Sequence, residues 1–367
     1  MKIVFINDGA YAYASGDPSA NGGAERDQWL LGAALARFGW SVTVGVSDGF
    51  APSERKSING VEFVGIDRGQ ILLSWYRFLS SERPDWLFWE CADYRWGPLV
   101  EIAKLLGVRT IFAAGLDREV ELRRALLWRA QWWPLYAWGL ARTDKIFVQH
   151  EGQLLGLPPR WRAKSLVFPK VCILPGVIGD ALKIKPHSQR EKYVAWVAML
   201  REPKRPDLLI EIARKAPSLR FVVCGGVTNL ATRPGYGERI GCELRALPNV
   251  QFLGQASPER AQQVIAGAAV LLSTSDEEGF PNTFVQAWSS GTPVVSLKLD
   301  PDHLIERHKL GLISGNVDRT LEELSTLLDS PERRAEMGLR GRRFIEDNYS
   351  ATAVVRLFER AVQGWRQ

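Results

Sequence analysis

The sequence predicts an α/β protein made of two Rossmann-like, doubly wound domains with parallel sheets. Its length of 367 residues is too great for one ordinary domain core and suits two. Short apolar runs alternate with helical patterns in two successive series, and such alternation produces parallel sheets. Between the two series, residues 174–192 lose the apolar runs and collect proline, glycine and charge, which is typical of a linker.

The first series begins at the N-terminus. Residues 2–7 are a short apolar run that Asn7 and Asp8 end at once, which indicates a strand and not a signal peptide. After a glycine-rich loop, apolar residues at helical spacing predict a helix over about 24–38, and Gly39 ends it. Further strands are predicted at 41–46, 86–89, 108–114 and 145–149, with helices at 98–107 and roughly 118–141.

The second series follows the linker. A strand is predicted over 193–199, and Pro206 then opens a helix, because proline suits the first helical position. Ser257 is the predicted N-cap of another helix that starts at Pro258. Strands at 220–225, 250–254, 269–273 and 292–297, a helix over 283–290 and a helical C-terminal region complete the series. These patterns place the domains at 1–175 and 190–345, followed by a C-terminal amphipathic helix at 346–367.

Composition excludes several classes of protein. The chain has no apolar run of about eighteen residues, so a membrane-spanning helix is not expected. Its four cysteines are scattered without CxxC spacing, which argues against a disulfide framework or a zinc site and favours a reduced, cytoplasmic protein. The net charge of +6 indicates an anionic partner. No helix-turn-helix, zinc-finger or RNA-binding signature accompanies the charge, so no nucleic-acid partner is expected.

Three segments fall at the carboxyl ends of predicted strands, where open parallel sheets bind their ligands. In the first, Gly22 and Gly23 let backbone amides approach a phosphate at the positive end of a helix; a merely flexible loop is the alternative. In the second, Arg201, Lys204 and Arg205 lie between a strand and a helix. Cations oppose the dipole at a helix start unless an anion is present, which favours a diphosphate site over a solvated loop.

The third segment runs from Ser275 to Phe284. Gly279 frees the backbone, Pro281 fixes the entry into the next helix, and the amides after it point towards the strand ends. Glu278 is predicted to accept hydrogen bonds from sugar hydroxyls. An acidic helix cap is the alternative interpretation, but the combination of acid, glycine, aromatic and proline favours a functional loop.

On these residues the sequence resembles the retaining glycosyltransferases of family 4, which have the GT-B fold with a cleft between two domains. The most specific part is 278–297, which is similar to the family's E-x7-E segment and the helix and strand behind it. Residues 196–213 resemble the first loop of the family's C-terminal domain, and 22–44 its N-terminal glycine loop and helix. The subgroup that it resembles acts in bacterial polysaccharide or glycan assembly.

The resemblance implies an enzyme that moves a sugar from a nucleotide-diphosphate sugar, UDP in preference to GDP, to a glycan or lipid-linked acceptor. It implies no metal and no further cofactor. Lys204 falls on the family's diphosphate-binding lysine, and Glu278 on the glutamate that contacts the donor sugar; Gly22 and Gly23 fall on the loop that faces the diphosphate. The remaining donor-binding positions that it implies are Arg201, Gly225, Gly279, Phe280, Asn282, Thr283 and Gln286.

Three positions depart from the family pattern. Met199 stands where the family often has a basic residue, and Arg201 is the expected substitute. Gln286 replaces the second glutamate; an amide still hydrogen-bonds ribose hydroxyls, but without charge assistance. No acceptor-pocket histidine is evident, and Asp117 and His150 are the nearest candidates for a catalytic role.

Other functions remain open at this point. An epimerase or a phosphorylase can use the same fold, and a phosphorylase would release phosphate where a transferase releases nucleotide. Met199 and Gln286 also motivate a non-catalytic scaffold, which would bind a nucleotide sugar without turnover.

Residues 123–142 interleave arginine with tryptophan. Basic, tryptophan-rich amphipathic helices lie in the headgroup layer of anionic membranes, which predicts peripheral contact with the inner face of the cytoplasmic membrane. A helix buried against the sheet is the alternative. The resemblance also suggests that the C-terminal helix crosses back onto the N-terminal domain.

Overall fold

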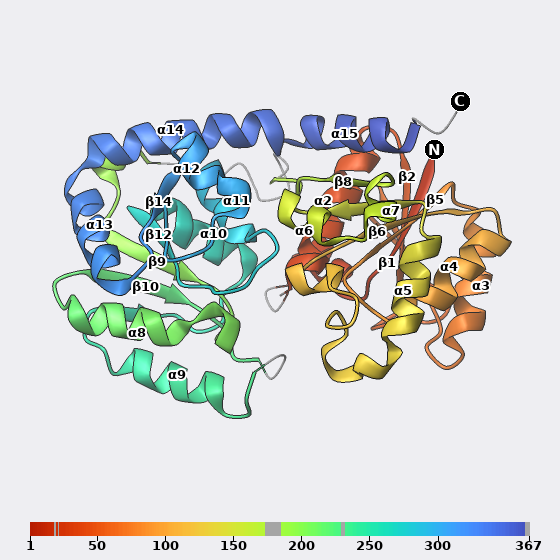
Figure 1. Cartoon of the computed structure of the whole chain (residues 1–367), viewed down its shortest axis with the longest axis horizontal. Helices are drawn as coiled ribbons and strands as arrows, with labels where there is room; N and C mark the ends of the chain where they lie inside the picture. The colour runs from red at the N-terminus through yellow and green to blue at the C-terminus, as the bar shows by residue number, and fades with distance from the viewer. Residues whose placement is uncertain (18–19, 21, 173–184, 229–231, 364–367) are drawn as a thin grey trace. The chain divides into compact units, whose positions relative to one another are not determined.

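The computed structural model describes residues 1–17, 20, 22–172, 185–228 and 232–363, without the side chains of 127 and 128. The chain forms two compact units (Figure 1). Unit 1 comprises Met1–Val171 and Ala351–Gln367, and unit 2 comprises Cys172–Ser350. The predicted linker at 174–192 lies outside the described residues as far as 184.

Unit 1 contains an eight-stranded sheet in the order β3-β4-β2-β1-β5-β6-β7-β8. Neighbouring strands are parallel except β3 and β4, which form an antiparallel pair at one edge. The central strands are buried on consecutive residues, as Ile3, Val4 and Phe5 are in β1, because helices cover both faces of the sheet. The strands are β1 Lys2–Ile6, β2 Ser41–Val46, β3 Arg55–Ile58, β4 Val61–Gly65, β5 Trp86–Glu90, β6 Arg109–Ala113, β7 Lys145–Val148 and β8 Ser165–Val167.

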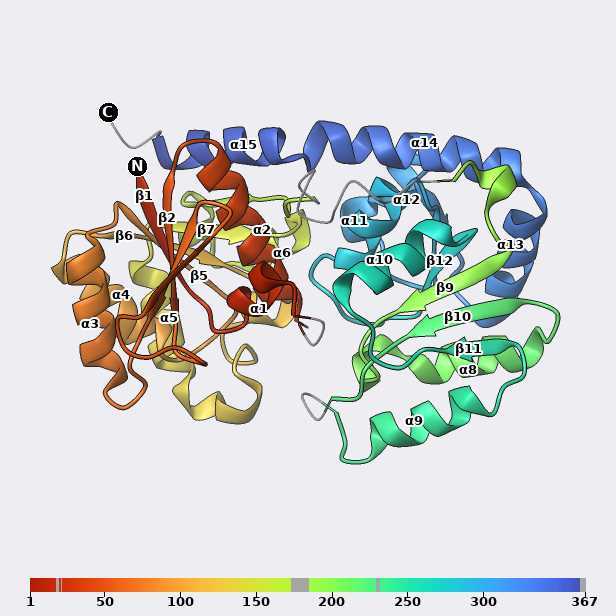
Figure 2. The same ribbon diagram turned by 180° about the vertical axis from the view of Figure 1, so that it is seen from behind.

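Two layers of helices cover this sheet. From behind, Figure 2 shows α1 and α2 on one face of the sheet, while α3, α4 and α5 lie on the other. The helices are α1 Ala10–Ser15, α2 Gly23–Arg37, α3 Ile71–Glu82, α4 Trp96–Leu105, α5 Trp133–Arg142, α6 Glu151–Gly156, α7 Pro159–Arg162 and α15 Ala351–Gln363.

The single long helix predicted over roughly 118–141 is wrong. The chain instead forms two short 3-10 helices, η1 Asp117–Val120 and η2 Leu127–Trp132, before α5 begins. Arg129 has non-helical backbone angles (φ −135°, ψ 39°). Pro134 lies in the first turn of α5, where its missing N–H is harmless, but proline cannot continue a helix that arrives from upstream.

The last helix, α15, packs within unit 1. Its buried face carries Phe358, whose ring lies 5.4 Å from that of Trp40, 5.9 Å from that of Phe147 and 6.0 Å from that of Phe168. Trp40 Nε1 also donates a hydrogen bond to Glu359 (3.3 Å). Aromatic contacts from three separate segments therefore hold α15 on this unit.

Unit 2 contains a six-stranded, all-parallel sheet in the order β11-β10-β9-β12-β13-β14. In sequence this is strand order 3-2-1-4-5-6, that of a dinucleotide-binding sheet. The order reverses between β9 and β12. The strands are β9 Tyr193–Val197, β10 Arg220–Cys224, β11 Val250–Phe252, β12 Val270–Ser273, β13 Val294–Ser296 and β14 Gly311–Ile313.

Helices cover both faces of this sheet too. Apolar residues of α8, α9 and α13 pack on one face, and those of α10, α11 and α14 on the other. The helices are α8 Pro206–Lys215, α9 Tyr236–Arg245, α10 Pro258–Gly267, α11 Asn282–Ser289, α12 Leu304–His308, α13 Val317–Asp329 and α14 Pro331–Asn348. The two predicted doubly wound sheets are thus confirmed.

Among the described residues, no helix combines the length and the apolar character needed to cross a membrane.

Candidate functional site

The reversal of strand order in unit 2 marks the place where a ligand is expected. Ligands of doubly wound sheets bind outside the carboxyl ends of the two strands at which the order reverses. These strands are β9 and β12, which pair directly through Val194 and Val270. The loop after β9 carries Lys204, and the loop after β12 carries Glu278. Two of the predicted site residues therefore lie at this position.

Lys204 and Glu278 form an ion pair through Nζ and Oε1. Their side chains are only 14% and 12% exposed, so the pair is largely removed from solvent. The Ser275 hydroxyl donates to Glu278 over 3.4 Å. The predicted phosphate-binding cation and the predicted sugar-binding carboxylate thus neutralise each other, and a bound donor would have to separate them.

A network of hydrogen bonds joins the two loops. Arg205 donates to both carboxylate oxygens of Asp207 at 2.8–3.1 Å and to Asp276 at 2.8 Å. The Asp276 amide donates to the carbonyl of Pro203 (2.9 Å), and the Thr274 hydroxyl donates to the carbonyl of Lys204 (2.7 Å). The guanidinium of Arg205 therefore fixes the β9 loop against the β12 loop. Sequence analysis had treated Arg205 only as a further cation.

Arg205 also has an unusual backbone conformation. Its φ of +49° lies in the left-handed region at the N-cap of α8, which is uncommon for a residue other than glycine. Such conformations persist when surrounding contacts determine them. The forked contacts of the Arg205 side chain supply that determination here.

The other predicted donor-binding residues of unit 2 lie in the loops after β9, β10 and β12 and in α11. Gly279 is buried, Asn282 and Thr283 open α11, and Arg201 directly precedes the short 3-10 helix η4, Glu202–Lys204. A Cβ on Gly225 would lie 2.6 Å from the carbonyl oxygen of Ala198, so this glycine allows the ends of β9 and β10 to approach closely.

Two of the predicted donor-binding residues, Phe280 and Gln286, are buried in unit 2. Phe280 is 4% exposed, and its ring lies 5.6 Å from Tyr349 and 6.3 Å from Trp288 in the core of unit 2. Gln286 is 8% exposed inside α11, and its backbone carbonyl accepts a hydrogen bond from the side-chain amide of Gln262. The ring of Phe280 is therefore part of the core of unit 2, which leaves only its backbone for the predicted role.

In unit 1 the order of strands reverses between β1 and β5. Gly22 and Gly23, the predicted phosphate-binding glycines, lie at the start of α2. Gly22 is the N-cap of α2 with a φ of +99°, and Gly23 is the first residue of that helix. A Cβ on Gly22 would lie 2.0 Å from Oε2 of Glu25. The Glu25 side chain thus folds over the positive end of α2, where a phosphate was predicted, and burial raises its pKa.

A buried charged group at the end of β5 was missed by the sequence analysis. Asp27 of α2 and Lys170, which follows β8, form an ion pair of 2.9 Å beside Glu90, the last residue of β5. Burial raises the pKa of Glu90 well above its ordinary value, and the charge of Asp27 adds to the effect. These three residues are too far apart in sequence to form a motif. The one feature of the sequence that could have indicated this site is Glu90, a carboxylate at the end of the apolar run 86–89.

These residues line a small cavity together with apolar side chains. Its interior volume of about 40 Å³ is room for roughly three water molecules and not for a sugar ring. The walls come from α2 and from the carboxyl ends of β5, β6 and β7. They are formed by Asp27, Leu31, Phe88, Glu90, Ala113, Ala114, Phe147, Val148, Gln149, Phe168, Pro169, Lys170 and Val171.

The two predicted catalytic candidates of unit 1 contact each other. His150, which precedes α6, places Nε2 2.7 Å from Oδ1 of Asp117 in η1. Gln153 donates to the same oxygen over 3.0 Å. The structure therefore brings Asp117 and His150 together, but neither residue lines the cavity of Asp27 and Glu90.

Glu119 makes the stability of the protein depend on pH. It is 4% exposed, and burial raises its pKa from 4.5 to about 7, although its carboxylate accepts a hydrogen bond from the Gly115 amide. Between pH 4.5 and 7 the folded state thus binds more protons at this group than the unfolded state does. Stability therefore falls as pH rises through this window, by about 3 kcal/mol in total for this group, and is constant above it.

The Glu119→Gln variant is expected to flatten this dependence by up to about 1.4 kcal/mol per pH unit. Urea unfolding at pH 5, 6, 7 and 8 measures the slope. Glu121→Gln is the matched control, because Glu121 is an exposed residue that pairs with Arg124. An unchanged slope in Glu119→Gln would show that another group carries the effect.

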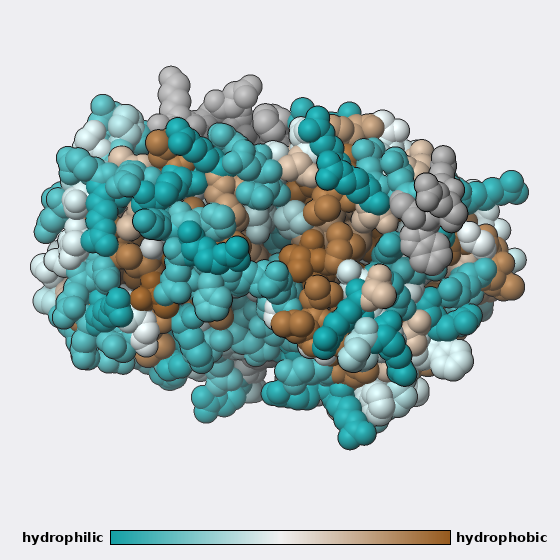
Figure 3. Space-filling model, turned by 45° about the horizontal axis from the view of Figure 1, so that its top comes forward, coloured by the Kyte–Doolittle hydropathy of each residue, from teal (hydrophilic) through white to brown (hydrophobic). Residues whose placement is uncertain are grey.

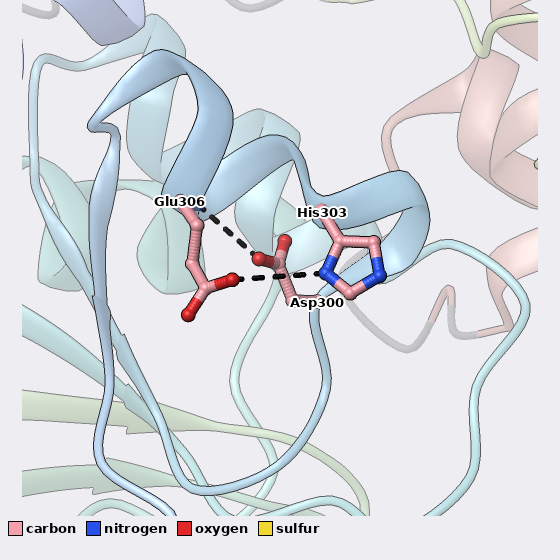
Figure 4. A group of neighbouring side chains, drawn as sticks. All are labelled: Asp300, His303 and Glu306. Atoms are coloured by element: carbon pink, nitrogen blue, oxygen red, sulfur yellow. Dashed lines mark hydrogen bonds and ion pairs between the residues drawn. The ribbon is translucent and has the colours of Figure 1, made fainter.

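One group of potential metal ligands lies in unit 2. Asp300, His303 and Glu306 gather before and within α12 (Figure 4). Asp300 accepts hydrogen bonds from the amides of Ile305 (2.7 Å) and Glu306 (3.2 Å), and His303 lies 3.7 Å from Glu306. The carboxylate of Asp300 thus acts as a helix cap, which accounts for this group without a metal.

Comparison with known proteins identifies the segment that carries Lys204 and Glu278. Residues 179–344 match the family described as glycosyl transferases group 1. This match lies within unit 2 and covers a little less than half of the chain. A D-inositol 3-phosphate glycosyltransferase of Corynebacterium efficiens is 30% identical over 156 residues, which cover 40% of this chain and only 37% of that relative.

Two solved structures are similar over nearly the whole chain. Sucrose-phosphate synthase from Thermosynechococcus elongatus has a TM-score of 0.73 at 15% identity, covering 99% of this chain and 98% of its own. Anabaena HepE in complex with UDP and glucose has a TM-score of 0.73 at 14% identity, covering 99% and 100%. At such identities the likeness concerns the fold, and it confirms the predicted GT-B fold.

Proposed function

We propose that this protein is a retaining glycosyltransferase of the family 4 type, which moves a sugar from a UDP-sugar to a hydroxyl group of a glycan or lipid-linked acceptor. The observation that carries the proposal is the Lys204–Glu278 pair at the carboxyl ends of β9 and β12, within the segment that matches glycosyl transferases group 1. The UDP in the HepE structure supports the choice of nucleotide. Retention of configuration follows from the family resemblance.

The proposed chemistry follows from the charges at this position. Breaking the anomeric C–O bond leaves positive charge on the sugar and negative charge on the departing diphosphate. Lys204 would stabilise the diphosphate, together with the N-terminal amides of α11. Glu278, released from Lys204, would accept hydrogen bonds from the sugar hydroxyls. Fixed charges of this kind are often the largest single contribution to catalysis.

Thermal unfolding with UDP, GDP, ADP and CMP, each alone, tests the donor site. A nucleotide at a hundred times its dissociation constant stabilises the fold by about 2.7 kcal/mol, and we expect UDP to give the largest shift. Turnover is then measured as UDP released from a UDP-sugar in the presence of an acceptor. Binding of UDP without turnover on any acceptor would favour the scaffold interpretation, and release of inorganic phosphate would favour a phosphorylase. No shift with any nucleotide would contradict the proposal.

The acceptor class is the finer part of the proposal. The relative from Corynebacterium efficiens is named for D-inositol 3-phosphate, so this compound and neutral inositol are the first acceptors to compare. A polysaccharide or lipid-linked acceptor remains our proposal from the family resemblance.

We further propose that unit 1 contacts the membrane surface through residues 123–142. Trp132 and Trp138 are 47% and 55% exposed, which supports contact with lipid over burial against the sheet. The Arg123 guanidinium lies 5.4 Å from the ring centre of Trp133. Figure 3 shows apolar side chains among the polar ones on the surface of unit 1. Tryptophan beside arginine suits the headgroup layer of an anionic bilayer.

Replacing both Trp132 and Trp138 with serine is expected to abolish sedimentation of the protein with anionic liposomes. Leu105→Ser is the matched control, because Leu105 is 77% exposed on α4, outside this stretch. Sedimentation of the double variant at the wild-type level would remove the membrane proposal.

A further inference from the structure

A groove with basic walls lies in unit 1 where strands β7 and β8 begin, at the opposite end of these strands from their carboxyl ends. The first residues of β7 and β8, Lys145 and Ser165, form one side together with Lys164. Leu357 and Arg360 of α15 form the other. The interior volume of about 290 Å³ is much larger than that of the cavity beside Glu90 and accommodates a polyatomic ion.

Three cations from three separate segments meet at this groove. Lys145 begins β7, Lys164 precedes β8, and Arg360 lies in the last helix of the chain. Two carboxylates are close in sequence, but both have other partners. Asp144 accepts hydrogen bonds from the amide and the hydroxyl of Thr110, and Glu359 accepts one from Trp40. Both carboxylates keep their charge, and that of Asp144 acts on Lys145 and Lys164, but the three cations outnumber them and the groove is positive overall.

Lys164 and Arg360 contribute in different ways. The Lys164 ammonium donates to the carbonyls of Leu140, Ala141 and Thr143 at 2.6–2.9 Å, so its three N–H groups cap the end of α5. It supplies positive charge, and burial lowers its pKa to about 8. Arg360 is exposed on α15 and presents a guanidinium, which matches the geometry of an oxyanion.

We propose that this groove binds a phosphate group, which ties α15 to the amino ends of β7 and β8. A phosphate offers up to two negative charges and several acceptor oxygens to Lys145 and Arg360, within the field of Lys164. It would bridge residues more than two hundred positions apart in sequence. The phosphate comes either from a soluble compound or from the headgroup of an anionic lipid, and the chemistry of recognition is the same.

The first experiment titrates the whole protein with inorganic phosphate, with chloride at equal ionic strength as the reference. At a hundred times its dissociation constant, phosphate is expected to lower the unfolding equilibrium constant about 100-fold. Hydrogen exchange in α15 should slow in parallel. The combined variant Lys145→Met, Arg360→Met is expected to lose both effects.

Two control variants test whether the stabilisation by phosphate arises at this groove. Arg356→Met changes an exposed arginine of α15 that does not line the groove and should respond to phosphate as the wild type does. Lys204→Ala should also respond, which separates this groove from the donor site. Circular dichroism and the cooperativity of unfolding report whether each variant is folded, so that the phosphate result does not depend on UDP binding.

Vesicles distinguish the two sources of phosphate. The wild type and the combined variant are compared on phosphatidylcholine alone and on phosphatidylcholine with phosphatidylglycerol. Loss of binding to the anionic vesicles in the combined variant, without an effect of soluble phosphate on the wild type, identifies a lipid headgroup. An effect of soluble phosphate that the combined variant lacks identifies a soluble ligand. The proposal would be overturned if the wild type and the combined variant responded equally to phosphate and equally to anionic vesicles, or if neither protein responded to either ligand.

Discussion

Replacing Lys204 with alanine is expected to lower kcat/KM by about 10²–10³-fold, the usual result of removing one group that stabilises transition-state charge. The fall should appear in both kcat and UDP affinity, because Lys204 would contact the diphosphate before and after bond cleavage. Initial rates of UDP release and UDP thermal shifts measure the two quantities. Lys192→Ala is the matched control, since this lysine of unit 2 is 67% exposed and pairs with Asp329.

The Lys204 variant also leaves Glu278 without its partner. An uncompensated buried carboxylate is strongly destabilising, by about 3–5 kcal/mol. The combined variant Lys204→Met, Glu278→Gln removes both charges and is expected to regain stability in urea unfolding but not activity. Activity that returns with stability would mean that the pair serves the fold and not the reaction.

Replacing Arg205 with methionine is expected to lower kcat/KM by about 10–100-fold, because a shift of about 1 Å in catalytic groups costs up to this much. Arg205 joins the loops that carry Lys204 and Glu278 and would act only by positioning them. Asp276→Asn should have a similar effect, and combining the two changes should add little, since both break the same contact. Arg214→Met, on the exposed side of α8, is the control.

Arg205→Gly separates the side chain from the backbone. Glycine adopts a φ of +49° without strain, so this variant keeps the shape of the loop and loses only the guanidinium. Activity as low as that of Arg205→Met is expected from steady-state kinetics. Full activity in the glycine variant, or additive losses in the combined variant, would show that the contact with Asp276 does not position the site.

The sequence predicted those strands and loops well whose pattern lies within one continuous segment of the chain. Strands such as β2 and β9 are buried on consecutive residues and rich in valine, and their limits were predicted closely. The loops that carry Lys204 and Glu278 were found because each directly follows such a strand. The edge strand β3, with alternate residues exposed and two charged residues in four, was not predicted.

The missed features depend on contacts between distant segments. Asp27, Glu90 and Lys170 meet only after the sheet of unit 1 has formed, and their spacing matches no local motif. Phe280 was assigned from its place in a motif, whereas its burial depends on Tyr349, far along the chain. The helix predicted over 118–141 failed for a local reason, since Pro134 cannot continue a helix that arrives from upstream and Arg129 has non-helical backbone angles.

The position of α15 has a consequence for synthesis on the ribosome. N-terminal domains usually complete their folding first, while the rest of the chain is still being made. Here unit 1 includes Ala351–Gln367, so it is complete only after all of unit 2 has been translated. Until then the aromatic rings of Trp40, Phe147 and Phe168 lack the cover of Phe358. A nascent chain that has emerged only as far as Val171 would therefore expose an apolar surface to which chaperones bind. A circular permutant that starts at Ala351 would not, because α15 is then made first.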